Sequence, residues 1–252
     1  MSISKSTDEL QAHRNLAIQK LDNFLSSLIN SDDSKMNGKA DKLSYWLEDW
    51  TTFLEYEPNF TPTKLRRYKR GEIIKVHLGF NIGSEEGGLH YAVVLDKNNA
   101  KTSPVVTIIP LTSVKPHVDT NKLKSGSVFL GNELFTNLSA KISSTQKHLS
   151  DEIALLNSLT EPLTLSNSLE HETNLSEKVE KITEELRLLN RMRSEVTRMK
   201  HGSIALVNQI TTISKIRIYD PKTDHDILSN IKLSNEKLDI IDDTIRKKFT
   251  NL

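Results

Sequence analysis

A long helical pattern interrupts a strand-rich sequence in this chain of 252 residues. Short runs of β-branched and apolar residues, separated by turn residues, fill residues 70–130 and return at residue 201. Between them, residues 134–200 place apolar residues at spacings of three and four, with Glu, Lys and Arg at the other positions. The sequence therefore predicts a β-rich domain that is split by an antiparallel helical hairpin with a coiled-coil seam. A hairpin whose ends lie close together can be inserted without breaking the host domain.

Two more helices are predicted before the first strand. The segment SDDSKMNGK at residues 31–39 separates them, and a pair of prolines ends the second helix. Thr7, which two acidic residues follow, is expected to cap the first helix. Trp46 and Trp50 lie on one face of the second helix. We interpret this face as a core or dimer surface, although base stacking by a tryptophan stays open.

The sequence as a whole predicts an α+β protein built from four segments. Residues 1–62 form a helical extension, residues 63–133 the first strand-rich part, residues 134–200 the hairpin, and residues 201–252 the remaining strands with a terminal helix capped by Ser234. Several short strands joined by tight turns are typical of a small barrel. We therefore expect a small β-barrel that carries a C-terminal helix and is interrupted by the hairpin.

The charge balance and the lack of cysteine exclude several kinds of protein. The net charge is +1, so any nucleic-acid binding must rest on a local patch. Without cysteine, no disulfide or thiolate zinc site can form. His148, His171, His201 and His225 share no ligand spacing, so we predict no metal site and no cofactor. The sequence shows neither a signal peptide nor an apolar stretch long enough to span a membrane, so a cytoplasmic protein without membrane contact is expected.

A basic run, KLRRYKR at residues 64–70, precedes the first predicted strand. Such a run can contact phosphate groups of a nucleic acid. The alternative, which we favour from the sequence, is a solvated linker.

Two parts of the strand-rich sequence resemble the MazF/PemK/Kid toxins. The first part is RGEIIKVHLGFNIGSEEGGLHYAVVLDKNNAKTSPVVTIIPLTS, and the second comprises SIALVNQITTIS and LSNEKLDIIDDTIRKKF. Together they cover roughly residues 69–130 and 202–250. The resemblance implies an SH3-like β-barrel with a C-terminal helix, in homodimers that cut single-stranded RNA at short sequences without metal and leave a cyclic phosphate. It also implies a cognate antitoxin that blocks the RNA groove.

Three positions depart from the pattern of that family. His90 stands where the family has its catalytic Arg, Asn208 replaces the acidic residue before Gln209, and Thr211 replaces a basic residue. Arginine is a fixed cation that clamps phosphate, whereas histidine is a titratable proton carrier. His90 therefore either transfers a proton or caps a strand in a degenerate site, and the sequence leaves both readings open.

The chemistry of RNA cleavage points to a small set of candidate residues. A metal-free ribonuclease must activate a ribose 2′-hydroxyl, stabilise the phosphorane and protonate the leaving oxygen. His90 is the catalytic candidate for proton transfer, and Thr112, at a strand end, is the candidate hydroxyl donor to the phosphate. The glycines of the loop at residues 83–88 let its backbone N–H groups approach a ligand closely. The side chains expected to bind RNA are Phe80, Asn81, Ser84, Glu85, Ser113, Asn208 and Gln209.

These features predict a toxin-like, metal-independent endoribonuclease that cuts single-stranded mRNA, inhibits growth and is neutralised by an antitoxin. Two alternatives stay open. One is a catalytically degenerate barrel that binds RNA or a protein, which the lost charges favour. The other is a scaffold in which the added helices form the working surface.

Overall fold

The fold comes from a computed structural model that describes most of the chain. The described residues are 5–160, 169–199 and 202–251, without the side chains of 159–174. His171 and His201, considered above as metal ligands, lie outside the described side chains.

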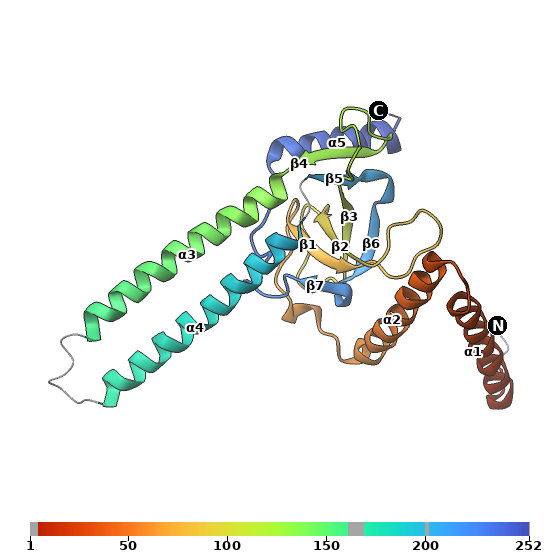
Figure 1. Cartoon of the computed structure of the whole chain (residues 1–252), viewed down its shortest axis with the longest axis horizontal. Helices are drawn as coiled ribbons and strands as arrows, with labels where there is room; N and C mark the ends of the chain where they lie inside the picture. Colours follow the sequence, from red (N-terminus) through yellow and green to blue (C-terminus); the bar gives the residue numbers. More distant parts are fainter. Residues whose placement is uncertain (1–4, 161–168, 200–201, 252) are drawn as a thin grey trace. The chain divides into compact units, whose positions relative to one another are not determined.

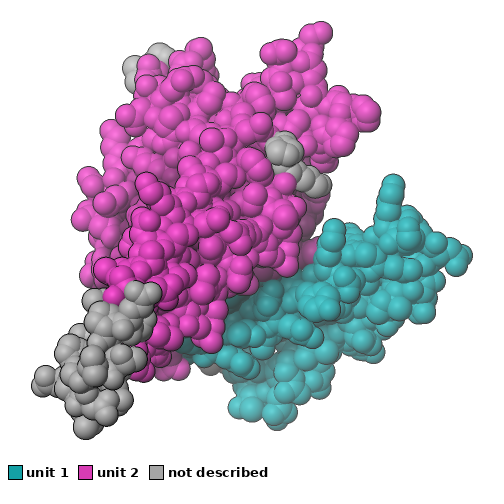
Figure 2. Space-filling model, turned by 60° about the vertical axis from the view of Figure 1, so that its left-hand side comes forward, with its two compact units in different colours: residues 1–58 teal, residues 59–252 magenta. Residues whose placement is uncertain are grey.

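The chain divides into two compact units, Met1–Pro58 and Asn59–Leu252, which Figure 2 colours separately. The first unit contains the two expected helices, α1 (Thr7–Ile29) and α2 (Ser34–Tyr56). Leu28 on α1 and Ala40 on α2 are the buried residues of these helices. The ring of Trp46 packs at 6.3 Å from that of Phe53, whereas Trp50 is exposed.

Ser6 caps α1, and not Thr7 as expected. The Ser6 hydroxyl accepts a hydrogen bond from the backbone N–H of Glu9 at 3.2 Å, and the Glu9 carboxylate accepts one from the backbone N–H of Ser6 at 2.7 Å. This reciprocal pair is a capping box, in which two N–H groups without helical partners are satisfied at once. Thr7 is therefore the first residue of the helix.

The second unit contains an antiparallel sheet of seven strands within its described residues. The strands are β1 (Ile73–His77), β2 (Leu89–Val94), β3 (Val105–Ser113), β4 (Ser127–Gly131), β5 (Ser203–Leu206), β6 (Thr211–Ser214) and β7 (Ile218–Asp220). They pair in the order β4-β5-β3-β2-β1-β7, and β6 pairs with β3 beside this path. The helices and this sheet together establish a mixed α/β protein. Because the sheet is open, the closed SH3-like barrel stays a prediction.

Strand β3 organises the sheet because different parts of it pair with different neighbours. Its first residues pair with β6, its middle with β2, and its last residues, including Thr112, with β5. Four of the runs singled out in the sequence form β1 to β4, and SIALVN supplies β5. The run SKIRIYD supplies only β7, because Lys215–Arg217 forms a short 3-10 helix. Strand β6 was not predicted.

The insertion forms two long helices, α3 (Glu133–Thr160) and α4 (Leu169–Arg198). Figure 1 shows them side by side, with α3 leading away from the sheet and α4 leading back to it. Lys141 on α3 fixes the base of the hairpin, because its ammonium donates to the carbonyl oxygens of Asp226, Ile227 and Ser229 at 2.9 Å each. The helical hairpin is therefore present, and a coiled-coil seam along it stays a prediction.

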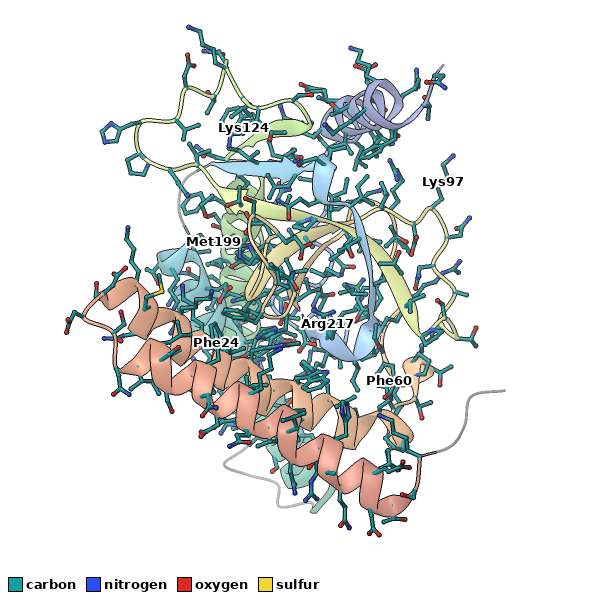
Figure 3. All side chains as sticks on the ribbon, turned by 90° about the vertical axis from the view of Figure 1, so that its right-hand side faces the viewer. Phe24, Phe60, Lys97, Lys124, Met199 and Arg217 are labelled. Atoms are coloured by element: carbon teal, nitrogen blue, oxygen red, sulfur yellow. The ribbon has the colours of Figure 1, made fainter. Side chains whose placement is uncertain are left out.

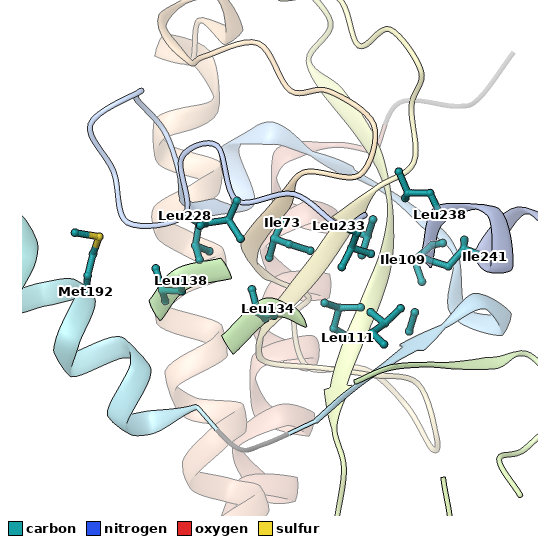
Figure 4. Packing of buried hydrophobic residues seen from close by; sticks show 14 of the residues in the cluster. Ile73, Ile109, Leu111, Leu134, Leu138, Met192, Leu228, Leu233, Leu238 and Ile241 are labelled. Atoms are coloured by element: carbon teal, nitrogen blue, oxygen red, sulfur yellow. The ribbon is translucent and has the colours of Figure 1, made fainter. Parts of the chain in front are cut away.

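One hydrophobic core joins the sheet to three helices (Figure 4). The last of these helices, α5 (Asn235–Phe249), begins at Ser234, whose hydroxyl accepts the backbone N–H of Lys237 at 3.3 Å, which confirms the predicted cap. The core therefore continues from the sheet into the base of the insertion. Its members include Ile73 and Ile109 from the sheet, Leu134 and Leu138 from α3, Met192 from α4, and Leu238 and Ile241 from α5.

Part of the basic run before β1 is built into the fold, so the interpretation of the whole run as a solvated linker is wrong, although Lys64, Arg67 and Lys69 are exposed. Tyr68 is fully buried and donates its hydroxyl to the carbonyl oxygen of Pro221 at 2.7 Å. Arg66 forms a buried ion pair with Glu72 at 3.1 Å. These contacts use the charge of Arg66 inside the protein, where a phosphate group cannot reach it.

Among the described residues, no helix is both long enough and apolar enough to cross a lipid bilayer.

Candidate active site

The loop between β1 and β2 is folded back on itself by close backbone contacts. The N–H of Leu78 donates to the carbonyl oxygen of Gly88 at 2.7 Å, and the N–H of Gly88 donates to that of Gly79 at 2.7 Å. A Cβ atom on Gly87 would lie 2.7 Å from the Gly79 carbonyl oxygen, which is closer than a carbon atom can approach. Position 87 therefore requires glycine for space, and the loop shape depends on it.

Two amide side chains hold this loop in place. The Gln209 side chain accepts the backbone N–H of Glu86 at 2.7 Å and donates to the carbonyl oxygen of Ser84 at 3.2 Å. The Asn81 side chain donates to the carbonyl oxygen of Glu86 at 2.6 Å. Both amides were expected to bind RNA, and both have hydrogen-bonding groups engaged with the loop. The backbone of Glu86 is consequently fixed on both sides.

His90 lies at the start of β2, between a carbonyl group and a carboxylate. Its Nδ1 atom is 3.1 Å from the carbonyl oxygen of Leu111, and its Nε2 atom is 3.6 Å from the Glu86 carboxylate. A carbonyl oxygen can only accept, so Nδ1 carries a hydrogen and Nε2 is the atom left for proton exchange. Both side chains are 26% exposed, so a ligand can reach them.

The first of two hollows on this face gathers the proposed catalytic residues. This His90 hollow has a volume of about 290 Å³. It places the imidazole of His90 together with the hydroxyl-bearing residues Thr112 and Ser113, and the exposed Lys115 adds a cation at its border. An imidazole, hydroxyl donors and an ammonium are the groups that a phosphodiester requires for proton transfer and charge stabilisation. Its lining residues are Leu89, His90, Tyr91, Leu111, Thr112, Ser113, Lys115 and Ser203.

The second hollow, of about 410 Å³, lies beside the loop and gathers most of the residues expected to bind RNA. This Gln209 hollow is lined by Asn81, Glu85, Asn208 and Gln209, with the Glu86 side chain among them. The contact between Glu86 and His90 connects the two hollows.

Two of the residues expected to bind RNA line neither of these hollows. Phe80 is half-buried in the loop after β1, and Ser84 is exposed and engages Gln209 through its backbone carbonyl. The two hollows therefore bring together seven of the nine sequence-derived site residues, with His90, Thr112 and Ser113 in one and Asn81, Glu85, Asn208 and Gln209 in the other.

The sequence did not single out Arg217, Glu86 or Lys115. Arg217 lines the Gln209 hollow and donates from its Nε atom to the carbonyl oxygen of His77 at 2.7 Å. Burial lowers the pKa of its guanidinium, and Figure 3 shows it among the strands, whereas Lys97 and Lys124 lie on outer loops. Sequence reasoning missed Arg217 because the run SKIRIYD, which contains it, was interpreted as a strand. Glu86 carried a signal in its position four residues before His90.

A possible metal-binding group lies on the hairpin, away from the two hollows. Ligand atoms of His148, Glu152 and Glu185 lie within 4.8 Å of one another. The ammonium of Lys181 donates to Glu152 at 2.9 Å and lies 3.9 Å from Glu185. This hydrogen bond lowers the pKa of Glu152. Lys181 therefore already supplies the positive charge that the two carboxylates attract.

The fold and the site together define an α/β protein with two neighbouring polar hollows that are joined by the contact between Glu86 and His90. Residues 69–156 match the family model of the PemK-like, MazF-like toxins of type II toxin-antitoxin systems. This part of the chain is therefore similar to the PemK/MazF toxins, a family whose members are endoribonucleases. The matched region runs from the residue before Arg70 into α3 and includes His90 and Thr112. No curated protein matches the chain.

Proposed function

We propose that this protein is a metal-independent endoribonuclease that cuts single-stranded RNA at short sequences. The observation that carries the proposal is that His90 on β2 and Thr112 on β3 line the same hollow, in the region that matches the toxin family. His90 offers an exchangeable proton at Nε2, and Thr112 offers a hydroxyl donor. We further propose a PemK/MazF-type barrel that acts as a homodimer in the cytoplasm and is neutralised by an antitoxin.

The arrangement of donors supports an RNA substrate rather than a small neutral molecule. Thr112, Ser113 and Lys115 present two hydroxyls and an ammonium along one stretch of chain. Hydrogen bonds and positive charge directed at a phosphodiester stabilise the charge that develops in the phosphorane. The neighbouring Gln209 hollow gives space for a nucleotide next to the cleavage point, so the two hollows together suit at least two linked nucleotides.

The test is cleavage of a long single-stranded RNA in the presence of EDTA. We expect the wild-type protein to cut at a short common sequence, and His90→Ala to lower the rate about 10²–10⁴-fold, as is typical when a general acid or base is lost. His225→Ala is the matched control, because His225 is an exposed histidine that lines neither hollow. Cleavage that persists in His90→Ala would move proton transfer to another residue. A folded wild-type protein that binds RNA and cuts none would overturn the proposal in favour of a binding module.

A further inference from the structure

We propose that Glu86 is a second catalytic residue, the general base that works with His90 as the general acid. This inference rests on the proposed ribonuclease function. The sequence placed Glu86 in the loop at residues 80–86 that was expected to hold RNA, but it gave the side chain of Glu86 no catalytic role, and its neighbour Glu85 was the acid expected to contact RNA.

The position of Glu86 distinguishes it from the other acidic residues of the site. Its carboxylate lies 3.6 Å from Nε2 of His90, so the two groups that exchange protons with water stand next to each other. Glu86 lines the Gln209 hollow, and His90 lines the His90 hollow. The pair therefore stands where an RNA strand would pass from one hollow to the other.

The backbone around Glu86 is held more firmly than that of a typical exposed loop residue. Gln209 accepts its N–H at 2.7 Å, and Asn81 donates to its carbonyl oxygen at 2.6 Å. The next residue, Gly87, packs so closely against Gly79 that no larger residue fits. Catalytic groups need such support, because a reacting group must stay within a fraction of an ångström of its productive position.

The two carboxylates of the loop differ in their surroundings. Glu85 is exposed, whereas Glu86 is half-buried and faces the imidazole. The alternative to a catalytic role is that Glu86 only orients the imidazole ring of His90. The Leu111 carbonyl already orients the ring through Nδ1, so the carboxylate faces the atom that reacts and not the atom that anchors the ring.

The proposed reaction moves one proton at each group. The Glu86 carboxylate takes the proton of the ribose 2′-hydroxyl while the 2′-oxygen forms a bond to phosphorus. The bond between phosphorus and the 5′-oxygen breaks, and Nε2 of protonated His90 gives its proton to that oxygen. The products are a 2′,3′-cyclic phosphate and a 5′-hydroxyl end. Exchange with water restores the ionised Glu86 and the protonated His90. RNA binding replaces the contact between the two side chains with a contact of each group to its own oxygen.

The first experiment compares Glu86→Gln with Glu184→Gln, a control at an exposed glutamate on α4 that lines neither hollow, in RNA cleavage across a range of pH. We expect Glu86→Gln to lose about 10²–10⁴-fold in kcat/KM and to lose the acidic limb of the pH profile, while Glu184→Gln keeps both limbs. Glu86→Asp, which keeps the carboxylate, is expected to retain the acidic limb at a reduced rate. A residue that only orients His90 would leave the acidic limb in place.

The second experiment separates the two proton transfers by changing the leaving group. An RNA whose scissile 5′-oxygen is replaced by sulfur needs no general acid, because the thiolate leaves without a proton. We expect this substrate to restore cleavage by His90→Ala and not by Glu86→Gln. Restoration in both variants would overturn the role of Glu86 alone. The same conclusion would follow if Glu86→Gln were as active as Glu184→Gln on ordinary RNA. Wild-type protein that cuts neither substrate would overturn the ribonuclease function itself.

Discussion

The hydroxyl of Tyr91 on β2 donates a hydrogen bond to the carboxylate of Glu195 on α4. The same carboxylate accepts a hydrogen bond from the ammonium of Lys75 on β1. Burial, followed by the hydrogen bond to Glu195, raises the pKa of Tyr91 above its ordinary range, so it stays a donor. Because Tyr91 follows His90 directly in the strand, the base of the inserted hairpin is tied to the strand that carries the candidate catalytic residue.

Glu195→Gln is expected to destabilise the second unit by about 1–3 kcal/mol at neutral pH, because a charged acceptor shared by two half-buried donors is lost. Burial raises the pKa of Glu195, and the hydrogen bonds from Lys75 and Tyr91 outweigh it, so the pKa lies below its usual value. A carboxyl with a lowered folded pKa stabilises the protein above its unfolded pKa of about 4.3 and loses this contribution as the pH falls through the folded pKa.

Urea unfolding of wild-type protein and Glu195→Gln at several pH values tests this expectation. The difference in unfolding free energy should be largest near pH 7 and shrink in the acidic range. Glu184→Gln, an exposed glutamate on the same helix, is the control and should change stability little. A difference that stays constant down to the acidic range would show that the carboxylate charge does not hold the hairpin.

Lys141→Met is expected to lower the unfolding free energy of the second unit by about 1–3 kcal/mol. The substitution keeps an apolar side chain of similar length and removes an ammonium that serves three carbonyl groups of one loop. Thermal unfolding measures the effect, with the exposed Lys147→Met on the same helix as the matched control. Equal stability of the two variants would mean that water replaces the ammonium at no cost.

Gln209→Ala is expected to release the loop at residues 83–88. The variant removes the acceptor for the Glu86 N–H and the donor to Ser84, two hydrogen bonds that together contribute on the order of 1–3 kcal/mol. Hydrogen exchange of the Glu86 amide should therefore accelerate about tenfold or more. Asn208→Ala, at the exposed neighbouring position, should leave that exchange rate unchanged. Equal protection of Glu86 in both variants would contradict the role of Gln209.

Gly87→Ala is expected to distort the same loop and to reduce RNA cleavage. A Cβ atom at this position would meet a backbone oxygen that cannot rotate away. Gly38→Ala is a useful comparison, because a Cβ atom there has open space and lies inside α2, where alanine is favoured by about 1 kcal/mol. Circular dichroism and cleavage assays on both variants measure the contrast. Full activity of Gly87→Ala would show that the loop shape is not required.

The sequence predicted those features that depend on local pattern. The runs that form β1 to β5, the cap at Ser234 and the split of the sheet by a helical hairpin were all visible as periodicity or turn chemistry. The sequence could not show that Ser6 and not Thr7 caps the first helix. Both residues carry a hydroxyl, and the reciprocal contact with Glu9 decides between them.

Features that depend on contacts between distant residues could not be predicted. Gln209 meets Glu86 across a separation of 123 residues, which changes a residue expected to bind RNA into one that also holds a loop. Arg70 pairs with Asp242 across 172 residues, so a run that looked like a solvated linker is built into the fold. Strand β6 is recognised only through its pairing with β3. In each case the partner is set by the folded sheet and not by neighbouring sequence.

The central claim is that this face of the protein cleaves RNA through the ribose 2′-hydroxyl without a metal. The most direct measurement uses a short RNA that spans one mapped cut site, in EDTA, and a copy with a single 2′-deoxynucleotide on the 5′ side of the cut. The account predicts cleavage of the RNA to a 2′,3′-cyclic phosphate, no cleavage of the deoxy-substituted copy, and loss of activity in His90→Ala. Equal cleavage of both oligonucleotides, or none of the RNA by folded protein, would contradict it.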